Sequence, residues 1–129
     1  MKDTVNIGEL LYFDKDKFNT HVLKRKYEGL VETPENYIDI IQDIVLNYER
    51  LFITEDNYQE KFLLLRKGKW VLLFNKSFRI YTCFLLTDFE IIEELLDYYV
   101  HTKVISKYME VKDENSAYKR IIKEIQKRT

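Results

Sequence analysis

The chain has 129 residues, which predicts a single domain over 1–129 because domains cluster near about 100–150 residues. Apolar residues make up 46% of the sequence and aromatic residues 15%, which excludes a globally disordered chain. Its 21 basic and 22 acidic side chains leave a net charge of -1. The single cysteine, Cys83, excludes an internal disulfide framework and a zinc site built from several thiolates.

The sequence contains no segment that could enter a membrane. The longest stretch without a charge covers residues 80–87, whereas a membrane-spanning helix needs roughly 20 apolar residues. The first residues lack the apolar segment of a secretory signal. We therefore expect a cytoplasmic protein without membrane contact.

Two helices are predicted in the first part of the chain. The first covers residues 14–27, with Asp14 or Asp16 as its cap and apolar residues at helical spacing. The second runs from Thr33 to about Arg50, because Thr33 suits the N-cap and the following proline suits the first helical position. Its apolar stripe consists of Tyr37, Ile40, Ile41, Ile44, Val45 and Tyr48.

The middle of the chain has the period of β-strands. Strands are predicted over residues 51–54, 59–66, 70–75 and 78–86, joined by short turns, which is typical of an antiparallel meander. Strict alternation in the last strand places Cys83 on one face, in the core, and assigns the opposite face to Phe78, Ile80, Thr82, Phe84 and Leu86.

Further helices are predicted after the meander. Thr87 and Glu90 have the spacing of a capping box ahead of an amphipathic helix. Residues 102–111 suit either a strand or a continued helix, and residues 113–128 predict a last helix with a basic exposed side. Two helices, an antiparallel sheet and then helices make an α+β domain.

The charges are segregated along the sequence. Residues 32–57 have a net charge of -6, residues 59–86 of +5, residues 87–101 of -5 and residues 102–129 of +4. Such blocks either form separate acidic and basic faces or pair with one another and cancel. The sequence leaves both arrangements open.

The most chemically suggestive segment lies on the first predicted helix. There His21, Lys24 and Arg25 share a face, which we expect to be exposed. A neutral imidazole can take a proton near pH 7, and a guanidinium can hold a phosphate at two points. The alternative is an ordinary solvated helix face. The sequence has no glycine-rich phosphate loop and no metal-binding motif, so we expect no cofactor and no metal.

The predicted sheet interleaves basic and aromatic residues. Cations that follow phosphates and rings that stack on bases are typical of RNA-binding proteins. The alternative is a sheet with one core face whose turns are kept soluble by lysine. The residues concerned are Lys61, Arg66, Lys67, Lys69, Lys76 and Arg79 among Phe62, Trp70, Phe74, Phe78 and Tyr81.

Over residues 10–100 this arrangement resembles the barnase–EndoU–colicin–RelE superfamily of small ribonucleases, in the forms carried by phages and mobile elements. The resemblance rests on the helix with His21, Lys24 and Arg25, on the acidic helix 33–50, and on a meander whose last strand carries Thr82. It implies metal-independent RNA cleavage, in which the 2′-hydroxyl attacks the adjacent phosphate.

The resemblance also implies a role for each site residue. His21 would act as base or acid, Arg25 with Lys24 would stabilise the phosphorane, and Thr82 would orient the phosphate. The second histidine that some members carry at the sheet is missing, because His101 follows the sheet. The general acid therefore stays unidentified.

Two other functions fit the same sequence. One is a non-catalytic phage or mobile-element protein, such as a regulator, inhibitor or immunity protein, whose acidic segments 32–57 and 87–101 contact a basic partner. The other is an RNA- or DNA-binding module that uses the basic last helix. Convergence of His21, Arg25 and Thr82 in one cleft would favour the ribonuclease.

Overall fold

The computed structural model describes residues 3–129, which form four helices, one five-stranded sheet and one two-stranded sheet. In chain order the elements are β1 (Thr4–Asn6), β2 (Tyr12–Asp14), α1 (Lys15–Tyr27), α2 (Pro34–Asn47), β3 (Arg50–Glu55), β4 (Lys61–Lys67), β5 (Trp70–Asn75), β6 (Ile80–Leu85), α3 (Ile92–His101), β7 (Lys107–Glu110) and α4 (Ala117–Lys127). This confirms the predicted α+β class, although two strands that the sequence pattern did not reveal precede the first helix.

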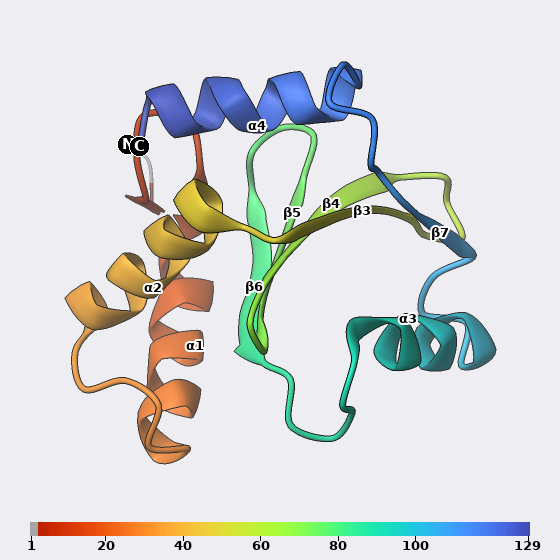
Figure 1. The fold of residues 1–129 in the computed structure, drawn as a ribbon. Helices are drawn as coiled ribbons and strands as arrows, with labels where there is room; N and C mark the ends of the chain where they lie inside the picture. Colours follow the sequence, from red (N-terminus) through yellow and green to blue (C-terminus); the bar gives the residue numbers. More distant parts are fainter. Residues whose placement is uncertain (1–2) are drawn as a thin grey trace.

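The five-stranded sheet is antiparallel throughout and has the order β6-β5-β4-β3-β7. Figure 1 shows α1 and α2 on one side of this sheet, α3 on the other and α4 across its upper end. Strands β1 and β2 pair separately. Every helix within residues 3–129 is too short or too polar to cross a bilayer.

The two faces of the sheet bury separate apolar clusters. Successive residues of a strand point to opposite faces, so β3, β4 and β5 contribute to both clusters. The larger cluster joins α1, α2 and α4 to one face and includes Phe13, Tyr37, Ile41, Leu63, Phe74 and Ile122. The smaller cluster joins α3 to the other face and includes Phe52, Leu64, Val71, Leu95 and Leu96.

Helix α2 begins where the sequence predicts but ends earlier. Thr33 Oγ1 accepts a hydrogen bond from Asn36 N at 3.0 Å, which confirms the predicted cap. The predicted end near Arg50 is wrong. Glu49 N already donates to Arg66 O at 2.8 Å, so the chain has joined the sheet before that residue.

The predicted capping box at Thr87 is wrong. Helix α3 begins only at Ile92, and the carboxylate of Glu94 accepts hydrogen bonds from Glu90 N and Ile91 N at 3.1 and 3.2 Å. A glutamate therefore caps the helix start, but four residues later than expected. The intervening segment carries the chain from β6 across to the far face of the sheet.

The last part of the chain resolves one open alternative and corrects one boundary. The segment 102–111 contains β7, which pairs with β3, so the strand alternative is confirmed. The last helix begins at Ala117 instead of Asp113, because Ser116 N first closes a turn onto Asp113 O at 3.0 Å. Ser116 then caps the helix through its side chain.

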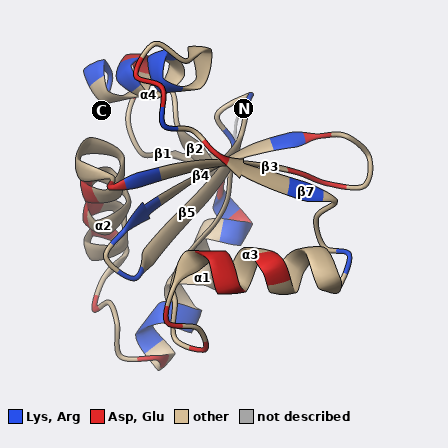
Figure 2. Cartoon of the chain, turned by 45° about the vertical axis from the view of Figure 1, so that its right-hand side comes forward, with Lys and Arg blue, Asp and Glu red and all other residues tan. Residues whose placement is uncertain are grey.

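The charged blocks pair with one another within the described residues. Of the six basic residues of segment 59–86, two form ion pairs with acidic residues of segment 32–57 and one with an acidic residue of β2, which favours the arrangement in which the blocks cancel. Figure 2 shows the remaining segregation, with acidic bands on α3 and basic bands on α1. The pairs are Arg66–Glu49, Lys67–Asp43 and Arg79–Asp14.

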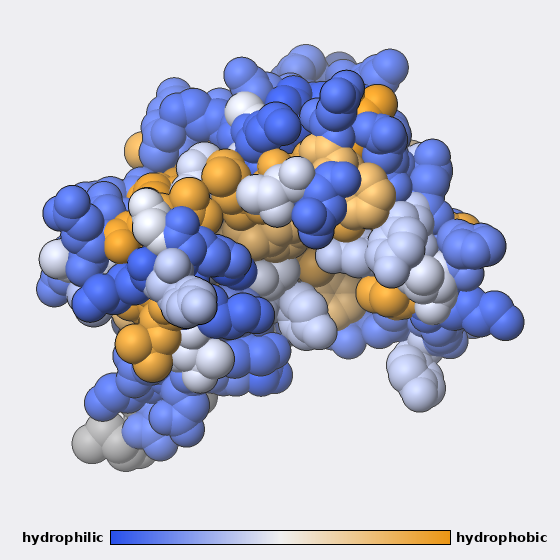
Figure 3. Space-filling view, turned by 90° about the horizontal axis from the view of Figure 1, so that it is seen from below, coloured by the Kyte–Doolittle hydropathy of each residue, from blue (hydrophilic) through white to orange (hydrophobic). Residues whose placement is uncertain are grey.

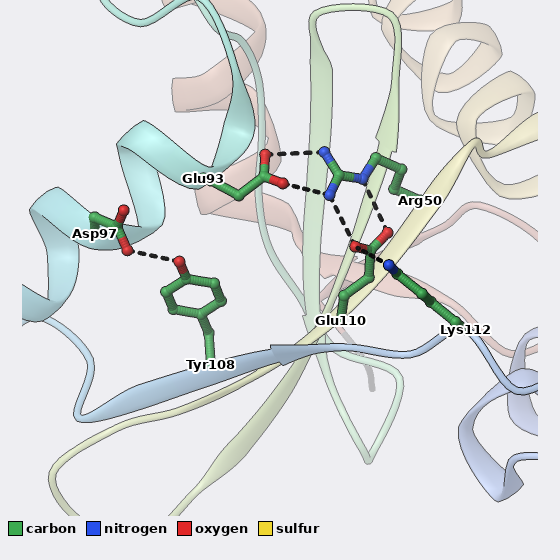
Figure 4. A network of polar contacts seen from close by, with 6 residues as sticks. All are labelled: Arg50, Glu93, Asp97, Tyr108, Glu110 and Lys112. Atoms are coloured by element: carbon green, nitrogen blue, oxygen red, sulfur yellow. Dashed lines mark hydrogen bonds and ion pairs between the residues drawn. The ribbon is translucent and has the colours of Figure 1, made fainter.

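One arginine attaches α3 to the sheet (Figure 4). The guanidinium of Arg50 donates to both oxygens of Glu93 at 2.9 and 2.5 Å and to both oxygens of Glu110 at 2.9 and 2.8 Å. One turn further along α3, Tyr108 Oη donates to Asp97 at 2.6 Å. Two-point contacts of this kind fix orientation as well as distance, so they set the angle of α3 over the sheet.

The two ends of the described chain meet (Figure 1). Glu9 N donates a hydrogen bond to Arg128 O at 2.7 Å. A Cβ atom at Gly8 would lie 2.6 Å from the same carbonyl oxygen, which is closer than van der Waals contact permits. Glycine at this position therefore allows the end of α4 to close over the β1–β2 segment.

We predict that Ile41→Ala or Ile44→Ala lowers the free energy of unfolding by about 2–5 kcal/mol, because each side chain is at most 1% exposed. Chemical denaturation measures this change, with the exposed Lys123→Ala as the control. Equal stability of the isoleucine and lysine variants would contradict the packing of α2.

Candidate functional site

A hollow of about 310 Å³ opens where α1, β6 and α3 meet. Figure 3 views the molecule from below and shows apolar surface in the middle of this face between polar flanks. Two of the four predicted site residues, His21 and Thr82, line the hollow, and Lys24 and Arg25 do not. The full lining is Lys17, His21, Tyr81, Thr82, Phe84 and Tyr99.

The expectation that Arg25 is exposed and available to a ligand is wrong. Arg25 is 5% exposed. Its Nε donates to Cys83 O at 3.1 Å, and its Nη1 donates to Glu28 Oε1 at 2.6 Å. Tyr37 Oη donates to the same Cys83 carbonyl at 2.7 Å. Because β6 is an edge strand, this carbonyl faces away from the ladder, and Arg25 is committed to satisfying it.

Lys17, and not Arg25, is the basic side chain that lines the hollow beside His21. It precedes His21 by four residues on α1 and therefore shares its face of the helix, whereas the exposed Lys24 lies outside the lining. Its Nζ lies 4.3 Å from the centroid of the Tyr81 ring. Counting back one turn from His21, as well as forward, would have found it.

A β-bulge lies beside Thr82 in β6, while Thr82 itself lies on the face opposite Cys83, as alternation predicts. Leu73 pairs with Thr82 but Phe74 pairs with Ile80, so Tyr81 is an extra residue in β6. Strict alternation is therefore wrong here: Ile80 and Cys83 both enter the larger core. The interpretation of Cys83 as a core residue is confirmed, and burial raises the pKa of its thiol to about 12.

The bulge also leaves Tyr81 on the surface. Its side chain is 52% exposed and meets the ring of Phe62 edge-on, with centroids 5.9 Å apart. Among the five aromatic residues that suggested an RNA-stacking sheet, it is the exposed one, because Phe74 is buried and the other three are partly buried. Tyr81 is therefore the one of these five aromatic side chains that is exposed for stacking on a base.

The imidazole of His21 is held in its neutral form. Burial is the largest cause, and together with the positive charges of Arg25, Lys24 and Lys17, in that order of effect, it lowers the pKa of the imidazole to about 4. Its Nδ1 is buried without a hydrogen-bond partner among the described residues, and the ring packs 5.5 Å from the Phe13 centroid. At pH 7 the ring can accept a hydrogen bond or a proton, but carries no proton to give as an imidazolium.

No three His, Cys, Asp or Glu side chains within residues 3–129 lie close enough together to hold a metal ion. The lining of the hollow likewise contains no carboxylate. Its polar groups are an ammonium, an imidazole and three hydroxyls, which suit an anion better than a cation.

We predict that Arg25→Met destabilises the protein, by about 1–3 kcal/mol, because it removes two hydrogen bonds from a buried site. The exposed Lys24→Met is the matched control and should leave the melting temperature nearly unchanged. Equal melting temperatures for the two variants would show that Arg25 is dispensable to the fold.

We predict a loss of stability as the pH falls from about 6.5 to about 4, because the unfolded chain takes up a proton at His21 before the folded protein does. Urea denaturation at several pH values measures it. His21→Gln should abolish this part of the pH dependence, and His101→Gln, at an exposed position, should retain it. Identical pH profiles for wild type and His21→Gln would contradict the neutral imidazole.

Comparison with known proteins gives one match. Residues 4–128 match a family model described as "Uncharacterised protein aq_aa01". No curated protein and no solved structure matches the chain.

Proposed function

The chain belongs to the aq_aa01 family, and we propose that it binds a small anionic ligand, without turnover, in the hollow between α1, β6 and α3. One observation carries this proposal. Lys17, which forms no ion pair among the described residues, lines the hollow together with the neutral His21 and three aromatic side chains. A cation at the mouth of an apolar hollow favours an anion with an apolar body.

The polar groups of the hollow contribute charge and hydrogen bonds to such a ligand. The Lys17 ammonium supplies the charge, and the Thr82 hydroxyl can donate a hydrogen bond to the same anionic group. A bound anion opposes the effect of the three neighbouring cations on His21 and so raises the pKa of the imidazole. Anion binding and protonation of His21 therefore favour each other.

Binding is a better account of the site than catalysis. General acid–base chemistry needs a group that gives a proton and a group that takes one. At pH 7 almost none of the His21 imidazole is in the imidazolium form that could give a proton, since its pKa is about 4. The guanidinium expected to stabilise the phosphorane is bonded to Cys83 O and Glu28 instead.

Metal-independent RNA cleavage is the second candidate, favoured by the fact that His21 and Thr82 line one hollow. In this mechanism the 2′-hydroxyl attacks the adjacent phosphorus, the 5′-oxygen leaves, and a cyclic phosphate forms. His21 would take the proton from the 2′-hydroxyl. Lys17 would replace Arg25 beside the phosphorane, and Thr82 would orient the phosphate.

We predict that benzenesulfonate, which stays ionised across the pH range, binds to the protein and that the neutral benzenesulfonamide does not. Isothermal titration calorimetry measures both. Lys17→Ala should weaken benzenesulfonate binding at least ~10-fold, since a charged hydrogen bond contributes about 1.5–3 kcal/mol. Lys24→Ala is the control and should bind like wild type. Affinity should rise as the pH falls from 7 to 5, but not in His21→Gln.

Two results would contradict the proposal. Equal binding of the sulfonate and the sulfonamide would show that charge is not recognised. Cleavage of total RNA in EDTA by wild type but not by His21→Ala would show turnover, and would replace binding by the ribonuclease candidate.

A further inference from the structure

A second cavity, of about 170 Å³, lies beneath the hollow between α3 and the sheet. We infer that it is the specificity pocket of the site, where an uncharged six-membered ring of the ligand binds and a polar atom on that ring bonds to the Thr54 hydroxyl. This inference rests on the proposed function for the position of the ligand's charged end.

The hollow and the cavity adjoin. Tyr81, Thr82, Phe84 and Tyr99 belong to the lining of both. In the inferred binding mode, a ligand whose anionic group lies beside Lys17 extends inward past these four shared residues. The deeper walls are apolar and consist of Leu64, Val71, Leu73, Leu96 and Ile105.

Thr54 is the exception in this apolar lining. It is 2% exposed, and its Oγ1 has no hydrogen-bond partner among the described residues. Its position in the register of β3, opposite Phe62 and Tyr108, places it on the face of the sheet that α3 covers. A buried hydroxyl without a partner destabilises a fold, and valine would fill the same space without that penalty. A ligand that bonds to the hydroxyl gives it a function.

The size of the cavity selects the kind of group that it can hold. Apolar cavities of roughly 150 Å³ in protein cores bind benzene. The cavity here is of similar volume, and apart from Thr54 and the four residues that it shares with the hollow its walls are leucine, valine and isoleucine. A ring with one hydroxyl would place apolar carbon against these walls and satisfy Thr54. Together with Lys17, this identifies the ligand class as a small hydroxyaryl acid.

The α3 helix frames the cavity and supplies part of both linings. Leu96 faces the cavity, and Tyr99, three residues later, lies where the cavity meets the hollow. The hydrogen bonds of Arg50 to Glu93 hold the N-terminal turn of this helix against the sheet. The walls of the cavity therefore come mainly from α3 and the sheet, which are hydrogen-bonded to each other.

The test compares 4-hydroxybenzenesulfonate with benzenesulfonate by calorimetry. Wild type should bind the hydroxylated ligand at least tenfold more tightly. Thr54→Val should abolish this preference, and Thr54→Ser should keep it, because serine retains the hydroxyl. Thr54→Val should also raise the melting temperature of the free protein, which a purely structural threonine would not do.

Phenol, which has the ring and the hydroxyl but no charge, separates this inference from the proposed function. Phenol should bind to wild type and to Lys17→Ala with similar affinity, and at least tenfold more weakly to Thr54→Val. If phenol binds in this pattern and neither sulfonate binds, the pocket is confirmed and the anion site fails. If benzenesulfonate binds, but the preference for the hydroxylated ligand is absent or survives Thr54→Val, the inferred pocket is wrong and the anion site stands. A lower melting temperature of Thr54→Val, with Thr54→Ser unchanged, would also overturn it by showing that the hydroxyl is already bonded.

Discussion

The carbonyl oxygen of Cys83 is the acceptor on which the arrangement of the site depends. It lies on β6, an edge strand, and accepts hydrogen bonds from Arg25 of α1 and Tyr37 of α2. A buried carbonyl at a sheet edge needs partners from outside the sheet. Here those partners orient α1 against β6, and the two turns of α1 that precede Arg25 thereby present Lys17 and His21 to the hollow. The residue that looked most suited to bind phosphate instead positions the residues that do line the site.

Local signals in the sequence were sufficient to locate the helices and the meander, but not all of their boundaries, strands β1 and β2, or the site. The cap at Thr33 and the apolar stripe of α2 depend on neighbours within one or two turns, and both are confirmed. The burial of Arg25 depends on a partner 58 residues away, and the bulge at Tyr81 depends on how β6 pairs with β5. Neither leaves a periodic trace in the sequence. Thr54 was missed for a related reason, because a threonine in a strand is unremarkable until its surroundings are known.

The two sides of the hollow are held by different chemistry. On the α1 side the hydrogen bonds from Arg25 and Tyr37 to β6 end on a backbone carbonyl, which does not titrate. On the α3 side they end on Glu93 and Glu110, and the bonds from Arg50 lower the pKa of both carboxyls. A carboxyl with a lowered pKa stabilises the fold at neutral pH, and this contribution is lost as the pH falls below the unfolded-state value of about 4.3. The attachment of α3 therefore weakens only below about pH 4.3, after the loss of stability that His21 causes on the α1 side from about pH 6.5 downward.

The contact between the two ends of the chain bears on how the protein is made. Glu9 N meets Arg128 O, and Ile122 and Ile125 of α4 share a core with Ile7 and Phe13. The N-terminal strands leave the ribosome first, so they lack their contacts with α4 until that helix has left the exit tunnel. During that interval their apolar side chains lack the cover that α4 provides. The residues of the candidate site on α1 and β6, by contrast, belong to elements that can come together before synthesis reaches α4, so the hollow can form before the fold closes around it.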